Sequence, residues 1–209
     1  MGQGVDKWLW QSGTVTESFR VCDLRRELDC MPTIPETRVL KWISWLPKKI
    51  NCFLWRVVLD GIPTREALAT RRVPISSIRC VMCSRSVESA DHLLISCEFA
   101  HQVWVAISQW IKVPMPRYML SVIETLEYLD NLQQTNQMKR AAYLIVATAC
   151  WSIWLARNQL IFKGTVPQLS KIVGEIKALS FLWINSRVES IKLDWKEWKE
   201  FKVAWASRL

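Results

Sequence analysis

The sequence predicts a mainly α-helical protein, and three observations lead to this fold class. Half of the 209 residues are hydrophobic, so the chain can bury a sizeable core. Only six glycines occur, which argues against a turn-dense β architecture. Apolar residues recur at helical spacing through most of the chain, which favours packed helices.

Three helices are expected in the first part of the chain. One begins near Ser18, a residue type that caps helices, and the prolines within residues 31–36 end it. A second begins after Pro47, and its apolar stripe extends to Val58. The third is capped by Thr64 and ends before the next proline.

Five further helices are expected in the second part of the chain. Asp194 and Glu197 have capping-box spacing at the start of the last one. A proline-containing stretch at residues 113–116 ends the first of them, which predicts two domains, 18–111 and a helical C-terminal region, 117–209. The five helices are expected at residues 98–111, 119–131, 137–162, 168–188 and 194–207.

Two apolar features are assigned to the core. Residues 141–156 carry no charge, but these 16 residues are fewer than the roughly 20 that span a membrane. We therefore expect a buried core helix here and no membrane partner. Helical spacing also predicts core positions for several tryptophans, namely Trp55, Trp104, Trp110, Trp151 and Trp154.

The charge balance and the cysteine content narrow the possible partners and the compartment. The net charge is +9, an excess that suits an anionic partner such as nucleic acid. Seven cysteines are an odd number, and no apolar secretory leader is visible, which favours a reducing intracellular compartment, nucleus or cytoplasm. Four cysteines stand alone and are expected to be small buried hydrophobes, namely Cys22, Cys30, Cys52 and Cys150.

The other three cysteines lie in residues 78–97, with the spacing Cys80-x2-Cys83-x8-His92-x4-Cys97. A Cys-x-x-Cys pair at a tight turn can present two thiolates to one ion, and His92 with Cys97 completes a tetrahedral set. Zn²⁺ suits this mixture of sulfur and nitrogen, and four protein ligands indicate a closed, structural site. A redox dithiol, a disulfide and a chance cluster are the competing interpretations.

The second histidine of the chain, His101, competes with His92 for the fourth ligand position. It lies four residues after Cys97, about one helical turn further on. A histidine on a helix surface needs no function, so we expect His101 to be no ligand.

The residues around the cysteines occur in the order of a known domain. Aromatic, basic and proline-containing steps come before the Cys-x-x-Cys pair, and a Glu-Ser-x-x-His-Leu step, a cysteine and a tryptophan follow it. The steps are "WLPKKINCFLWR" (45–56), "IPTREAL" (62–68), "CVMC" (80–83), "ESADHLL" (88–94), Cys97 and Trp104.

This order resembles the zinc-binding domain that follows the polymerase in plant non-LTR retrotransposon reverse transcriptases. The resemblance covers residues 18–104 well and the remainder loosely. Within the remainder, "CWSIWLARNQLIF" (150–162) looks like the segment that follows in such elements. It implies a helical domain with one structural Zn²⁺ held by three cysteines and His92, followed by a helical C-terminal half. It also implies a reverse transcriptase polymerase domain as a possible partner.

The activity of that polymerase does not carry over to this sequence. A reverse transcriptase needs paired aspartates that hold two metal ions, and the chain has no Asp-Asp pair. No P-loop, HExxH or GxSxG motif occurs either. We therefore expect a non-catalytic module derived from the C-terminal part of such an enzyme.

Basic residues near the cysteines predict binding of RNA or single-stranded DNA. Lysine and arginine side chains would neutralise phosphates, and exposed tryptophans would stack on unpaired bases. The alternative is a structural or protein-interaction module, or an inactive retroelement relic. The candidate phosphate contacts are Lys48, Lys49, Arg71, Arg72, Arg79 and Arg85.

Overall fold

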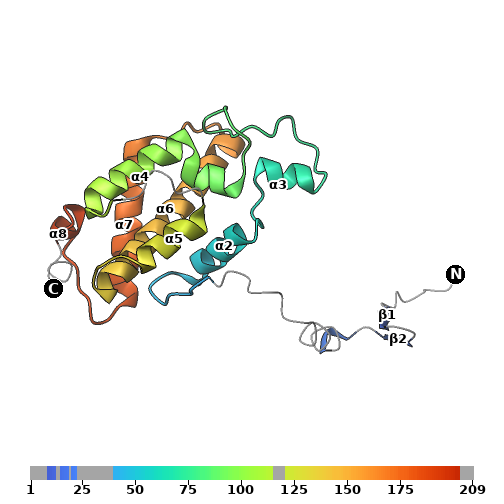
Figure 1. The fold of residues 1–209 in the computed structure, drawn as a ribbon, viewed down its shortest axis with the longest axis horizontal. Coiled ribbons are helices and arrows are strands. Elements are labelled where there is room, and N and C mark those ends of the chain that lie inside the picture. The colour runs from blue at the N-terminus through green and yellow to red at the C-terminus, as the bar shows by residue number, and fades with distance from the viewer. Residues whose placement is uncertain (1–8, 13–14, 19, 23–39, 115–120, 203–209) are drawn as a thin grey trace. The chain divides into compact units, whose positions relative to one another are not determined.

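The computed structural model describes residues 9–12, 15–18, 20–22, 40–114 and 121–202 (Figure 1). The chain divides into two compact units, Met1–Val39 and Leu40–Leu209. The first unit contains a β-hairpin, in which β1 (Leu9–Ser12) pairs antiparallel with β2 (Val15–Ser18). The sequence did not predict this hairpin. Most of the helix expected after Ser18 lies outside the described residues.

The second unit is helical, which confirms the predicted fold class. It begins with α2 (Lys48–Val58), which follows Pro47 as expected and buries the stripe that starts at Ile50. Next comes α3 (Arg65–Thr70), where the hydroxyl of Thr64 accepts a hydrogen bond from the backbone N–H of Ala67 at 3.3 Å. The predicted cap of this helix is therefore confirmed.

The remaining helices also match the expected positions. α4 is Glu98–Ile111 and α5 is Val122–Asp130, the latter capped by the Ser121 hydroxyl. α6 (Asn136–Lys163) ends at Gly164, whose φ of 65° places it in the left-handed region that favours glycine at this position. α7 is Leu169–Arg187.

The last helix is shorter than the sequence suggested. α8 (Trp195–Lys199) begins at Asp194, whose carboxylate accepts hydrogen bonds from two backbone N–H groups of the first turn. Phe201 has a φ of 53°, so the backbone leaves the helix there, and the rest of the expected helix lies mostly outside the described residues.

The centre of the second unit is α6, which contacts α2, α4, α5 and α7 (Figure 1). All residues from Ala141 to Cys150 are buried, which confirms the expected core helix. By length and composition α6 is apolar enough to cross a membrane, but 67% of its most apolar window is buried inside the fold. That degree of burial is typical of a core helix.

Most of the tryptophans expected in the core lie there. Trp104, Trp110 and Trp154 are buried, and Trp151 is half-buried against Phe53, with ring centroids 5.1 Å apart. The expectation for Trp55 is wrong, because half of its side chain is exposed. Leu54 faces the core, and each residue advances about 100° round a helix, which turns Trp55 toward solvent.

The isolated cysteines divide into two groups. Cys150 is buried as expected, and burial raises its pKa to about 12. Cys22 and Cys52 are exposed, which contradicts the expectation of small buried hydrophobes. Cys30 lies outside the described residues.

Helices from both sides of residues 113–116 pack together. α4 contacts α6 and α7, and the indole N–H of Trp110 donates a hydrogen bond to the Trp198 carbonyl at 3.1 Å. The two indole rings also meet edge to face, with centroids 5.3 Å apart. The division into domains 18–111 and 117–209 stays a prediction.

Candidate metal centre

The first two cysteines lie in a tight hairpin-like turn. Arg79 and Val87 form an isolated antiparallel bridge, and Cys80 donates its backbone N–H to the Ser86 carbonyl at 2.8 Å. Ser84 closes the turn: its N–H donates to the Cys80 carbonyl at 2.8 Å, and its φ is 59°. The turn therefore brings the two side chains of the Cys-x-x-Cys pair to one side.

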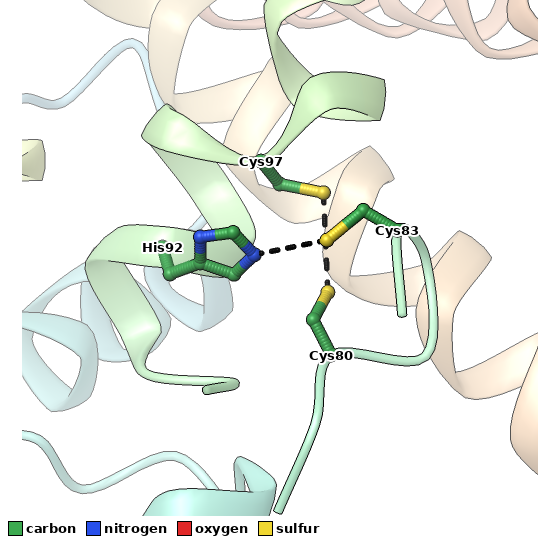
Figure 2. A group of neighbouring side chains, drawn as sticks. All are labelled: Cys80, Cys83, His92 and Cys97. Atoms are coloured by element: carbon green, nitrogen blue, oxygen red, sulfur yellow. Dashed lines mark hydrogen bonds between the residues drawn. The ribbon is translucent and has the colours of Figure 1, made fainter. Parts of the chain in front are cut away.

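The four predicted ligands converge on one point (Figure 2). Their ligand atoms all lie within 4.8 Å of one another. The sulfurs of Cys80 and Cys97 are 3.9 Å apart, and the Cys83 sulfur lies 3.3 Å from Nε2 of His92. Cys80 and Cys97 are buried, whereas Cys83 and His92 are half-buried.

His92 and Cys97 come from a short π-helical turn, η1 (His92–Ser96), and from the residue that follows it. The Cys97 N–H donates to the His92 carbonyl at 2.7 Å, five residues back, which places both side chains on the side that faces the cysteine turn. The hydroxyl of Ser96 lies 3.3 Å from Nδ1 of His92. This contact orients the ring so that Nε2 points at the sulfurs.

The surroundings of the buried pair favour a thiolate on Cys97. The hydrogen bond from Cys80 lowers the pKa of Cys97, burial opposes this decrease, and backbone N–H groups of the first turn of α4 lower the pKa further. The same shared hydrogen bond and burial raise the pKa of Cys80, although backbone N–H groups of Cys83 and Met82 oppose this increase. N–H groups that point at both sulfurs are suited to thiolate ligands.

This donor set fits zinc. Three sulfurs and one imidazole nitrogen are a frequent ligand set of tetrahedral structural zinc sites, and no fifth donor joins them in the part of the chain that the structure describes. The structure does not bring His101 into the cluster, because this residue lies exposed on α4. The cysteine sulfurs are free rather than joined in disulfides.

Residues 26–104 match the sequence family described as zinc-binding in reverse transcriptase. The match covers less than half of the chain, so it shows what this segment is similar to. The matched segment contains all four clustered side chains, α2, α3 and the first half of α4. Its first residues, 26–39, lie outside the part of the chain that the structure describes.

The chain is also similar to a longer plant protein. It is 29% identical over 124 residues to a putative ribonuclease H protein of Arabidopsis thaliana. The match covers 58% of this chain but only 19% of the length of that relative. No solved structure matches the chain significantly.

Glu88 joins the matched segment to the C-terminal helices. One carboxylate oxygen accepts hydrogen bonds from the Arg157 guanidinium, at 2.6 and 3.2 Å, and from the Arg65 N–H at 3.0 Å. The other oxygen accepts from the Val81 N–H, inside the Cys-x-x-Cys turn, at 3.1 Å. The side chains of Glu88 and Arg157 are 0% and 4% exposed, so this ion pair is fully buried.

A second acidic residue of the segment binds another helix. The Asp91 carboxylate accepts the backbone N–H of Val122 at 2.9 Å, at the first turn of α5. Asp91 precedes His92, and Glu88 reaches the cysteine turn through Val81. The metal cluster is therefore anchored to both α5 and α6.

The predicted phosphate-binding arginines differ in whether their guanidinium groups contact other groups of the protein. Arg85 forms an ion pair with Glu98 at 3.0 Å, and Arg79 donates to the Arg85 carbonyl at 2.9 Å. Arg71 donates to the Asp60 carbonyl at 3.2 Å. Among the described residues, the Arg72 side chain has no hydrogen-bond or ion-pair partner.

The predicted lysines lie on the first turn of α2. Both Lys48 and Lys49 are exposed, and the Lys49 ammonium lies 5.8 Å from the centre of the Trp151 ring. Whether these lysines and the four arginines bind nucleic acid stays a prediction.

Sequence analysis missed two features of the site. Glu88 and Arg157 are 69 residues apart, so no local pattern joins them, although each lies in a segment that resembles the family. The exposure of Trp55 was missed as well. Its position one residue after the core Leu54 indicates that it faces away from the core.

Proposed function

We propose that this protein is a non-catalytic, zinc-stabilised module that binds single-stranded nucleic acid. The observation that carries the proposal is the exposed face of α2, which combines a half-exposed indole, Trp55, with the cations Lys48, Lys49 and Arg56. Aromatic side chains between cations are the usual means of binding unpaired bases and their phosphates. The family match supports an origin in a reverse transcriptase.

In this proposal the zinc ion has a structural role. Cys80, Cys83, His92 and Cys97 would fill all four positions of one tetrahedral ion, which leaves none for a reactive water. The ion would join the cysteine turn to the start of α4. Because Glu88 and Asp91 lie in the same segment, the metal would also fix α5 and α6.

Replacing Trp55 by alanine should weaken binding to a fluorescein-labelled single-stranded RNA or DNA about 5- to 150-fold. Stacking of one base on an aromatic ring contributes about 1–3 kcal/mol. The fold should be retained, because half of this side chain is in solvent. Fluorescence anisotropy at low ionic strength measures the dissociation constant.

The matched control for Trp55 is Phe162→Ala. Phe162 is an exposed aromatic residue of α6, with 77% of its side chain in solvent. This variant should bind the strand as the wild type does. If wild-type protein shows no salt-sensitive binding, or if both variants bind unchanged, the proposal is wrong.

Arg72 offers a test in which binding and stability change in opposite directions. Its φ of 59° lies in the left-handed region, at the end of α3, where Val73 donates its N–H to the Leu68 carbonyl at 3.0 Å. Glycine is the usual residue at this position of a helix end. The Arg72 guanidinium has no partner among the described residues, so a phosphate contact would offset the conformational cost of this position.

Arg72→Gly should therefore weaken strand binding and stabilise the fold. Removing one phosphate contact should reduce the salt dependence of binding by about 0.7 in log K per log salt. A left-handed conformation costs a residue with a Cβ about 1–2 kcal/mol, and the greater backbone freedom of glycine in the unfolded chain offsets part of this, so the free energy of unfolding should rise by less than about 2 kcal/mol. Anisotropy at several salt concentrations and urea unfolding measure the two effects, and unchanged binding would remove Arg72 from the interface.

A second candidate function is docking against a protein partner, such as the polymerase part of a reverse transcriptase. The observation in its favour is a group of exposed apolar residues in the last turns of α6 and just after it, namely Leu155, Ile161, Phe162 and Val166. Exposed apolar side chains that gather in one region are typical of protein contacts. Such a contact would depend less on salt than strand binding does, so salt titration separates the two functions.

A further inference from the structure

A pocket of about 400 Å³ lies at the start of α6, formed by three segments of the chain. Lys41 and Ile43 precede α2, Asp130 ends α5, and the remaining residues belong to α6. Its volume is within the range of small-ligand sites. The lining residues are Lys41, Ile43, Asp130, Asn136, Lys139, Arg140 and Tyr143.

Two hydrogen bonds from side chains of α6 to backbone carbonyl groups hold the rim of the pocket. The buried Tyr143 donates its hydroxyl to the Lys41 carbonyl at 3.0 Å, across 102 residues of sequence. The Lys139 ammonium donates to the Asp130 carbonyl at 2.8 Å. These two hydrogen bonds fix the segment before α2 and the end of α5 against α6, so the pocket is formed by the fold itself.

The lining carries more positive than negative charge. Lys41, Lys139 and Arg140 are cationic, and Asp130 is the one acidic residue among the lining residues. Its carboxylate pairs with Lys41 at 3.6 Å, whereas Arg140 has no ion-pair partner among the described residues. The positive end of the α6 dipole adds to this potential, so the pocket favours an anion.

We propose that this pocket binds a backbone phosphate of the single-stranded nucleic acid; the inference rests on the proposed function and assigns part of the binding surface to this pocket. Trp42 directly follows Lys41 in the chain, and 54% of its side chain is exposed. A cationic pocket whose lining residue Lys41 precedes an exposed indole in the chain offers two contacts for one nucleotide, a salt link to phosphate and a stacking surface. None of the residues that the sequence predicted to contact phosphate lines this pocket.

The test replaces Lys139 and Arg140 with glutamine in the full chain. A control variant, Lys163→Gln with Lys171→Gln, removes the same amount of charge outside the pocket. The probe is a labelled single-stranded RNA, and its dissociation constant is measured at several chloride concentrations. The pocket variant should bind at least 5-fold more weakly, and its salt slope should fall by about 0.7 for each lost phosphate contact.

A second readout uses inorganic phosphate in place of chloride at constant ionic strength. Phosphate should weaken strand binding by the wild type and by the control variant, and should have less effect on the pocket variant. Equal weakening of the two variants would overturn the pocket proposal and leave the proposed function intact. A wild-type protein that does not bind the strand would overturn both.

Discussion

Replacing Glu88 by alanine should destabilise the protein by about 3–5 kcal/mol, because the substitution leaves the Arg157 guanidinium buried without its partner. The backbone N–H groups of Val81 and Arg65 would lose their acceptor as well. Urea denaturation of the zinc-loaded protein, followed by circular dichroism, measures this loss.

Glu98→Ala is the matched control for this prediction. It removes the same side chain from an ion pair with Arg85, but there the two side chains are 77% and 57% exposed. An exposed pair of this kind contributes about 0–1 kcal/mol. Equal, small effects of the two substitutions would contradict the anchoring role of Glu88.

A double substitution separates the ion pair from the other contacts of Glu88. Replacing Glu88 and Arg157 together with methionine removes both charges, so no uncompensated charge remains buried. The double variant should lose less stability than the sum of the two single variants, with a coupling energy of about 0.5–3 kcal/mol.

His92→Ala and Cys83→Ala should each abolish stoichiometric zinc binding and unfold residues 78–97. A structural zinc ion supplies about 10–16 kcal/mol of apparent binding energy in zinc-finger peptides, so the loss of one ligand has a large effect. The unfolding should extend to α5 and α6, because Glu88 and Asp91 lie in this segment. Metal analysis after dialysis against a weak chelator, with amide exchange of the same samples, measures both effects.

His101→Ala is the matched control for the histidine ligand. His101 lies exposed on α4, outside the cluster, so this variant should retain about one zinc ion per chain. If Cys83→Ala kept its full zinc content, the proposed ligand set would be wrong.

The helices were predictable because their ends are encoded locally. Thr64, Asp194 and Gly164 are residue types whose preferences at helix ends do not depend on distant contacts. The metal cluster was predictable for a similar reason: the spacing of Cys80, Cys83, His92 and Cys97 lies within 18 residues. Local chemistry was sufficient for both.

Long-range contacts were not predictable from sequence. Periodicity says which side of a helix is apolar but not what covers it, so neither the Glu88–Arg157 pair nor the pocket next to Tyr143 could be derived. Glu88 lies in the step 88–94, and Arg157 lies in the segment 150–162. The sequence relates these two segments only through their resemblance to the same family. The β-hairpin of the first unit was missed because its short strands carry little pattern.

X-ray absorption spectroscopy at the zinc edge tests the central claim of this account most directly. Purified wild-type protein should give three sulfur ligands at about 2.3 Å and one nitrogen ligand at about 2.0–2.1 Å around a single zinc ion. Substitution of His92 should remove the signal, and substitution of His101 should leave it unchanged. A spectrum with oxygen ligands or fewer than three sulfurs, or a protein purified under reducing conditions that binds no zinc, would contradict the account.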